Sequence, residues 1–141
     1  MRILALDIGE RRIGVAAADD RTRVAIPIAT ITVEGDPVDT IVRLIQEQQA
    51  DELVVGLPLS LSGALGPQAQ RVQALVEALT ARLPLPVRTW DERLTTVQAG
   101  RRPPERRRRG RSGRVVPAEG RDALAAAIIL QAYLDSQRHS H

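Results

Sequence analysis

The sequence predicts an α/β fold in which one five-stranded mixed sheet is flanked by helices. Three short β-branched runs follow one another with only turns between them, which is typical of an antiparallel meander. Helical and strand-like runs then alternate, which favours parallel strands. With 141 residues, 43% of them hydrophobic, the chain is expected to form a single domain over residues 1–141.

The first three strands are expected at residues 2–8, 13–18 and 24–32. Pro27 interrupts the third run. Because proline cannot donate a hydrogen bond to a strand ladder, this strand suits the edge of a sheet.

The apolar spacing then becomes helical. Asp36 predicts an N-cap, with Pro37 at the first helical position. The apolar face of this helix is Val38, Ile41, Val42, Leu44 and Ile45. Residues 52–56 read as a buried strand and residues 57–66 as a loop rich in Pro, Ser and Gly, after which Pro67 opens a second helix.

The last part of the chain holds one strand and one helix. The strand is expected at residues 87–91 and the helix at residues 118–136. Residues 100–117 consist mostly of Arg, Gly, Pro and Ser, and we interpret them as a mobile loop because they have little to bury. Residues 136–141 are interpreted as a polar tail.

The basic charge comes from arginine alone, since none of the 20 basic residues is Lys. Between residues 100 and 114 lie eight Arg and one Glu, a local charge of 8 − 1 = +7 in a chain of net charge +3. A planar guanidinium can donate to two phosphate oxygens, so we predict contact with nucleic acid here rather than only a solvated loop. The predicted binding residues are Arg101, Arg102, Arg106, Arg107, Arg108, Arg109, Arg111, Arg114 and Arg121.

The composition also excludes several classes of site. Trp90 and Tyr133 are the only aromatic residues, too few for a base-stacking platform. The absence of Cys excludes disulfides, thiolate chemistry and zinc-thiolate sites. We find neither a signal peptide nor an apolar run near the ~20 residues of a membrane span, so we expect a cytoplasmic protein without a membrane partner.

Four carboxylates lie at the ends of predicted elements. Asp7 is near the end of the first strand, on the face opposite its two apolar neighbours. Asp91 and Glu92 end the fifth strand, and Asp122 begins the last helix. Oxygen ligands without Cys or a well-placed His favour Mg²⁺ or Mn²⁺ over zinc.

Each of these carboxylates also has an ordinary structural interpretation. Asp7 suits a turn or cap, and Asp122 suits a helix N-terminus, where the helix dipole favours negative charge. Glu92 suits a surface ion pair with Arg88 or Arg93.

Four segments resemble the signatures of the YqgF/RuvX family, described both as Holliday junction resolvases and as pre-16S ribosomal RNA nucleases. They are residues 4–18 (LALDIGERRIGVAAA), 54–66 (VVGLPLSLSGALG), 91–96 (DERLTT) and 122–134 (DALAAAIILQAYL). The motifs occur in order at compatible spacing, and the resemblance covers about residues 3–135. It implies a ribonuclease H-like fold and a nuclease that hydrolyses phosphodiester bonds with two Mg²⁺ or Mn²⁺ ions.

The resemblance further implies that Asp7, Glu92 and Asp122 are the catalytic, metal-binding residues. Asp91 is the alternate to Glu92, because neighbouring residues on a strand point to opposite faces. The implied substrate is branched DNA or a ribosomal RNA precursor, and the alternative function is a non-catalytic nucleic-acid-binding module of the same fold. Symmetrical cutting of a junction favours a homodimer, whereas an RNA-processing nuclease suits a monomer.

Three further residues, Gly14, Gly56 and Pro58, match backbone-shaping positions of the family, and we interpret them as turn geometry. The chain departs from the family pattern at Glu10, where a small or hydroxyl residue is usual, and in its arginine content between residues 100 and 120.

Overall fold

The computed structural model describes residues 1–95, 116–117 and 121–138. The elements in chain order are β1 (Arg2–Ile8), β2 (Arg12–Asp19), β3 (Ile26–Thr32), α1 (Val38–Gln48), β4 (Glu52–Leu57), α2 (Pro67–Arg82), β5 (Val87–Asp91), the 3-10 helix η1 (Glu92–Leu94), β6 (Val116–Pro117) and α4 (Arg121–Arg138). This order matches the one expected from the sequence, with η1 and β6 added.

The strands form one mixed sheet in the order β5-β4-β1-β2-β3-β6. β1, β2 and β3 make the antiparallel meander, and β4 and β5 run parallel to β1, so the predicted α/β fold is confirmed. Because β1, β4 and β5 are parallel, their carboxyl ends lie along the same edge of the sheet, where ligand sites gather in α/β folds.

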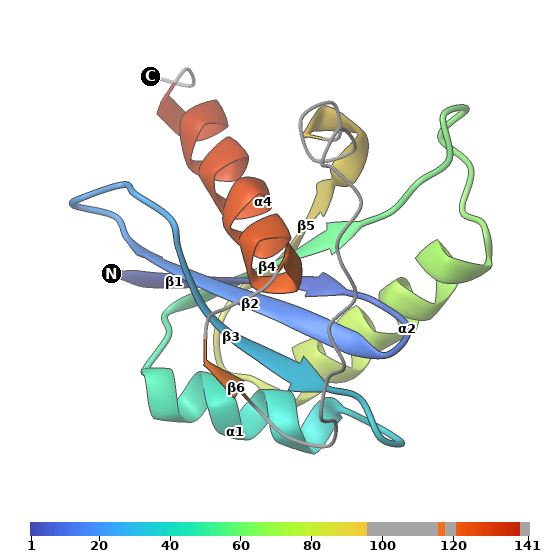
Figure 1. The fold of residues 1–141 in the computed structure, drawn as a ribbon, viewed down its shortest axis with the longest axis horizontal. Coiled ribbons are helices and arrows are strands. Elements are labelled where there is room, and N and C mark those ends of the chain that lie inside the picture. Colours follow the sequence, from blue (N-terminus) through green and yellow to red (C-terminus); the bar gives the residue numbers. More distant parts are fainter. Residues whose placement is uncertain (96–115, 118–120, 139–141) are drawn as a thin grey trace.

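Helices cover both faces of the sheet (Figure 1), with α1 and α2 on one face and α4 on the other. The core under α1 and α2 takes one set of alternating β1 side chains, Leu4, Leu6 and Ile8. The core under α4 takes the other set, Ile3 and Ala5. Asp7 continues this second set, so its side chain lies on the α4 face, as the alternation predicted.

The contact between α4 and the sheet is built from small residues. The buried alanines of this contact are Ala5, Ala16, Ala18, Ala123, Ala126 and Ala127. Side chains this short allow the helix axis to approach the sheet closely. The close approach carries the first turn of α4 over the end of β1 and the start of β2.

The first helix starts one residue later than predicted. α1 begins at Val38, and Pro37 is its N-cap residue, so Asp36 does not occupy the cap. The Asp36 carboxylate nevertheless accepts a hydrogen bond from the Val38 amide (3.1 Å), which satisfies a donor that the first turn leaves free. The predicted apolar face of α1 is confirmed, since all five of its residues are buried.

The arginine-rich segment ends in a strand rather than a loop. Val116 and Pro117 form β6, which pairs antiparallel with Thr30 and Ala29 of β3. A proline is tolerated there because β6 lies at the edge of the sheet. The remaining residues of the predicted loop, 100–115, lie outside the described residues.

The last helix also differs at its end. α4 continues to Arg138, so the first residues of the predicted 136–141 tail are helical. Two hydrogen bonds hold this turn, from Ser136 Oγ to the Tyr133 carbonyl (2.8 Å) and from Gln137 Nε2 to the Tyr133 hydroxyl (3.0 Å). Residues 118–120 of the predicted helix lie outside the described residues.

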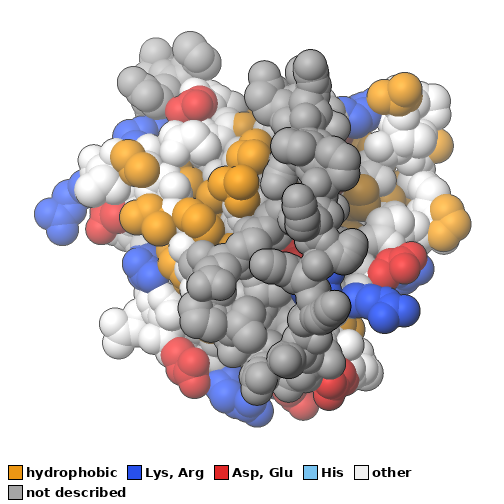
Figure 2. Space-filling model, in the orientation of Figure 1, with side chains coloured by type: hydrophobic (Ala, Val, Ile, Leu, Met, Phe, Trp, Pro, Cys, Tyr) orange, Lys and Arg blue, Asp and Glu red, His pale blue; other side chains and the backbone are white. Residues whose placement is uncertain are grey.

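The surface beside α4 carries exposed apolar side chains (Figure 2). Val24, which precedes β3, and Ile26, its first residue, are 55% and 56% exposed.

No helix among the described residues combines the length and apolar character needed to cross a membrane.

Candidate active site

Asp7, Glu92 and Asp122 come from three elements that meet at the carboxyl edge of the parallel strands. Asp7 is the penultimate residue of β1, and Glu92 opens η1 directly after β5. Asp122 lies in the first turn of α4. The structure therefore brings all three predicted acids to one end of the α4 face.

Asp7 and Glu92 form a hydrogen-bonded carboxyl pair. Burial and the nearby Asp7 charge raise the pKa of Glu92 to about 8, which favours its protonated form near neutral pH. Burial also raises the pKa of Asp7, and the charge of Asp122 adds to this, although the bond from Glu92 opposes it. The pair resists carrying two negative charges unless a cation accompanies them.

The third acid is held by a cation of the protein. Arg12 Nε lies 3.0 Å from Asp122 Oδ2, and the two side chains are 59% and 34% exposed. Asp122 is close enough to influence Asp7 electrostatically, but its carboxylate is directed to Arg12. Within the described residues, no group of three or more His, Cys, Asp or Glu side chains is arranged so that it could hold a metal ion.

Asp91, the neighbour of Glu92, binds Arg93. The Arg93 amide donates to Asp91 Oδ1 (3.0 Å), and Arg93 Nη2 lies 2.6 Å from Asp91 Oδ2. These bonds hold the pKa of Asp91 below its usual value. Of the two adjacent acids, Glu92 is therefore the one that meets Asp7. Arg93, considered as a surface partner of Glu92, is engaged by Asp91.

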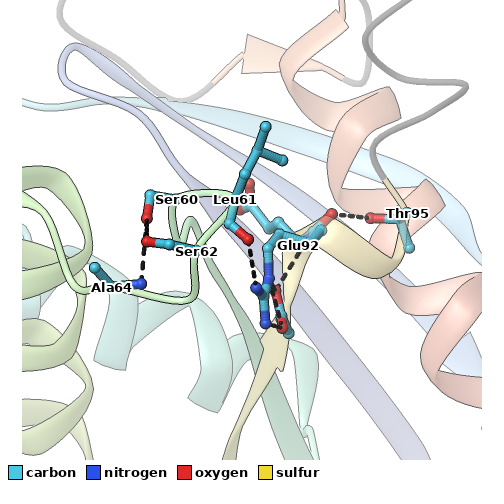
Figure 3. Close-up of polar contacts among 8 residues, drawn as sticks. Ser60, Leu61, Ser62, Ala64, Glu92 and Thr95 are labelled. Carbon is cyan, nitrogen blue, oxygen red and sulfur yellow. Dashed lines mark hydrogen bonds and ion pairs between the residues drawn. The ribbon is translucent and has the colours of Figure 1, made fainter.

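The same arginine fixes the loop that precedes α2. Arg93 Nη1 donates to the Leu61 carbonyl (3.2 Å), and the loop is further braced by bonds among Ser60, Ser62 and Ala64. Figure 3 shows this loop lying beside the turn that carries Glu92. The carbonyl of Glu92 in turn accepts a hydrogen bond from Thr95 Oγ1 (3.2 Å).

Gly14 and Gly56 do not serve turns, contrary to the sequence interpretation. Both lie inside strands, and neither has a positive φ. A Cβ at Gly14 would lie well inside van der Waals contact of the Asp122 carbonyl, and a Cβ at Gly56 would lie 2.5 Å from Glu92 Oε2 and 2.7 Å from Ile129 Cδ1. The two glycines therefore make room for the acids of the site.

The structure also identifies one cation that the sequence prediction did not include. Arg12 and Gly14 are two residues apart on β2, so their side chains lie on the same face of the strand. This is the α4 face, where Arg12 lies next to Asp122. The signal was available in the sequence, since the alternation was regular, but the partner lies 110 residues away. The predicted arginines between residues 101 and 114 lie outside the described residues. Arg121 begins α4, and its side chain is not described.

A second buried acid lies under α4 at the opposite end of β4. Glu52 is 6% exposed and accepts hydrogen bonds from the Tyr133 hydroxyl and from Arg88 Nε (2.8 Å). Burial and the bond to Glu52 raise the pKa of Tyr133 to about 12. Trp90 packs edge-on against Tyr133 with 6.1 Å between ring centroids. Arg88 is thus engaged by Glu52 and not by Glu92.

Comparisons with known proteins identify the family of the chain. A family model described as RuvX, Holliday junction resolvase, matches residues 1–136. A protein of Chloroflexus aurantiacus named "Putative pre-16S rRNA nuclease" is 46% identical over 138 residues, which cover 96% of this chain and 88% of that protein. A protein of the same name from Caldanaerobacter subterraneus is 42% identical over 144 residues, covering 99% of this chain and all of its own length.

Solved structures confirm the predicted ribonuclease H-like fold. The structure of Thermus thermophilus RuvC in complex with a Holliday junction substrate superposes with a TM-score of 0.58 at 12% sequence identity, and the match covers 98% of this chain and 96% of that one. A second Thermus thermophilus RuvC structure gives a TM-score of 0.56 at 11% identity, covering 99% and 97%. At this level of identity the likeness concerns the fold.

Proposed function

Because the chain belongs to the RuvX family, we propose that it is a metal-dependent nuclease that hydrolyses phosphodiester bonds in structured nucleic acid. The observation that carries this proposal is the Asp7–Glu92 pair, two carboxyl groups that face each other at the carboxyl edge of the sheet. Two acids that face each other in a half-buried position oppose folding, because like charges repel. A purely structural role does not require such a pair.

The chemistry of the donors suits Mg²⁺ or Mn²⁺, because Asp7 and Glu92 offer hard oxygen ligands whose charges a divalent cation would offset. Asp122 would have to leave Arg12 to join them. Asp122 would complete the set from the first turn of α4. Ions held by these acids would supply a lowered pKa for the attacking water and charge stabilisation for the leaving 3′ oxygen, and a 5′-phosphate product is expected.

The protein's own residues supply placement. β1 and η1 hold Asp7 and Glu92 against each other, while Gly14 and Gly56 leave the space that a side chain would fill. The bonds from Arg93 to Asp91 and Leu61 fix the turn on which Glu92 sits. A site held by the sheet and the adjacent turn in this way keeps its acids in position before substrate arrives.

The arginines at positions 101, 102, 106–109, 111, 114 and 121 are proposed to contact the phosphate backbone. Such interactions position a substrate without reading its bases. Replacing Arg106, Arg107, Arg108 and Arg109 by Ala should weaken binding. For each phosphate that is no longer bound, the log–log salt dependence of the binding constant should become flatter, by about 0.9 for duplex and about 0.7 for single strands.

Two substrates are supported by different comparisons. The names of the curated relatives support a ribosomal RNA precursor, and the description of the family model supports a four-way DNA junction. Junction cutting predicts a two-fold dimer in solution, because the junction itself has two-fold symmetry. Sedimentation of the chain with and without each nucleic acid tests this point.

The deciding experiment is a cleavage assay on 5′-labelled pre-16S RNA and on a four-way DNA junction. It is run with Mg²⁺, with Mn²⁺ and with EDTA. We expect cleavage only with a divalent ion, and Asp7→Asn should reduce the rate by about 1,000-fold. Asp39→Asn is the matched control, since Asp39 is an exposed carboxylate of α1 that pairs with Arg82.

The outcomes separate the alternatives. Cleavage that survives in Asp7→Asn at the rate of the unaltered protein would show that the active site lies elsewhere. Tight binding of either nucleic acid without cleavage under any metal condition would instead indicate the non-catalytic binding module. The substrate cut with the higher kcat/KM identifies the class on which the chain acts.

A further inference from the structure

We propose that Arg12 is a phosphate-binding residue of this site, which is held by Asp122 in the free protein and moves to a substrate phosphate when nucleic acid binds. This inference rests on the proposed nuclease function. It adds a residue that contacts substrate, outside the arginine-rich segment.

The backbone at Arg12 is fixed while its side chain is exposed. The Gly9 amide donates to the Arg12 carbonyl (2.9 Å), and the Val33 amide donates to the Arg11 carbonyl (2.8 Å), so the start of β2 is tied to β1 and to the end of β3. The Arg12 side chain remains 59% exposed. A fixed backbone with an accessible guanidinium suits a residue whose side chain must reach a ligand.

The bond that Arg12 makes in the free protein is easily exchanged. Among the described residues, its guanidinium donates to Asp122 through Nε. Exposed ion pairs contribute little net stability, because water and salt compete for both partners. A guanidinium has five N–H donors in a planar fork that fits two phosphate oxygens, so a phosphate is the stronger partner.

The other arginines near the site are committed to structural contacts. Arg93 binds Asp91 and the Leu61 carbonyl, and Arg88 binds the buried Glu52 at the far end of β4. Within the described part of the chain, Arg12 is the guanidinium that pairs with an acid of the proposed site.

The exchange also solves an electrostatic problem of the site. Asp7, Glu92 and Asp122 gather negative charge where a polyanion must approach. If Arg12 moves to the phosphate, it offsets this repulsion and at the same time releases the Asp122 carboxylate toward Asp7. A single movement of the Arg12 side chain would then bind the substrate phosphate and free the Asp122 carboxylate.

Binding in a non-cleaving background tests the proposal. In Asp7→Asn protein with EDTA, fluorescence anisotropy is measured with a labelled RNA hairpin and with a labelled four-way DNA junction across a range of salt concentrations. Adding Arg12→Ala should weaken binding about tenfold. It should also reduce the log–log salt slope by about 0.7 for single strands and about 0.9 for duplex. Arg12→Lys keeps the charge but loses the fork, and should recover only part of the affinity.

Arg82→Ala is the matched control. Arg82 makes a similar exposed ion pair, 3.0 Å from Asp39, but it lies at the end of α2 away from the site. Its removal should leave affinity and salt slope unchanged. Circular dichroism and thermal unfolding of each variant show whether a loss of binding follows a loss of folding.

A mutant cycle with Asp122→Asn separates phosphate binding from support of Asp122. Releasing Arg12 from its ion pair should tighten binding, and Arg12→Ala should remove most of that gain. Unchanged affinity and slope in Arg12→Ala would overturn the proposal, as would an equal gain from Asp122→Asn with and without Arg12. If Arg12→Ala loses binding while the unaltered protein cleaves neither nucleic acid with Mg²⁺ or Mn²⁺, the phosphate contact is supported and the nuclease function is rejected.

Discussion

The two ends of the sheet under α4 both hold carboxyl groups shielded from water, buried at Glu52 and half-buried at Asp7 and Glu92, but the groups around them differ. At the start of β4, Glu52 is enclosed by hydrogen-bond donors, the Tyr133 hydroxyl and the Arg88 guanidinium. At the end of β1, Asp7 meets another acid, Glu92. The same helix covers both ends.

This difference shows that the partner, and not burial alone, separates a structural acid from a functional one. A buried carboxylate that accepts hydrogen bonds has its polar atoms satisfied, and these bonds hold together the elements that supply the donors. A half-buried pair of carboxyl groups is left with a charge that a proton or a cation must offset. The predictions that follow change one end at a time, beginning with the largest expected effect.

Gly14→Ala should damage the Asp7 end most. Its Cβ would overlap the Asp122 carbonyl and lie 2.8 Å from the Ala123 amide nitrogen, so α4 would have to move away from the sheet. We expect a loss of about 3 kcal/mol in the free energy of unfolding, measured with urea. Gly66→Ala is the control, because its Cβ would meet nothing within 4 Å, and it should cost about 0.5–1 kcal/mol as an N-cap change. Equal losses in the two variants would contradict this interpretation.

Replacing Glu by Gln at the two ends should change the free energy of unfolding in opposite directions. Glu52→Gln removes the charged acceptor of Tyr133 and Arg88 and should lower stability by about 2 kcal/mol. Glu92→Gln removes an acid that resists ionisation and should raise the stability of the metal-free protein at pH 8 by about 1–2 kcal/mol. Urea unfolding in EDTA measures both. Destabilisation by both variants would remove the distinction between the two ends.

The stability of the metal-free protein should depend on pH through Glu92. Its folded pKa of about 8 lies above the ordinary value of 4.5, so the folded state binds the proton more tightly than the unfolded state. The resulting stabilisation is complete below about pH 4.5 and is lost as the pH rises through 8. Unfolding midpoints at pH 5, 6.5 and 8 should fall for the unaltered protein and change less for Glu92→Gln. Parallel curves would count against the assignment.

The smallest effect is expected at Asp91. Asp91→Asn weakens a partly exposed ion pair with Arg93, so it should cost about 1 kcal/mol or less. Because that pair fixes the turn carrying Glu92, cleavage should slow by roughly tenfold in single-turnover assays. A loss as large as that of Asp7→Asn would instead make Asp91 a member of the active site.

Local periodicity predicted the parts of the fold that depend on neighbours in sequence. The alternation around Asp7 assigned it to the correct face, and the helical spacing from Val38 to Ile45 identified the buried side of α1. Periodicity could not choose between Asp91 and Glu92, because the chain changes there from a strand to a 3-10 helix.

Contacts between distant segments were beyond the sequence. The Arg12–Asp122 pair joins residues 110 positions apart. Gly14 and Gly56 were interpreted as turn residues because the helix and the acid that approach them come from elsewhere in the chain. The pairing of β6 with β3 likewise depends on where the fold returns the chain.

The edge-on contact between Trp90 and Tyr133 gives the protein a built-in optical reporter. Trp90 is the sole tryptophan of the chain, so the tryptophan fluorescence of the protein reports on one place, the contact between β5 and α4. It lies two residues before Glu92, and its indole nitrogen is buried without a hydrogen-bond partner in the described residues. Emission wavelength and quenching of unlabelled protein would therefore follow any shift of α4 against β5, in real time and at a single known position.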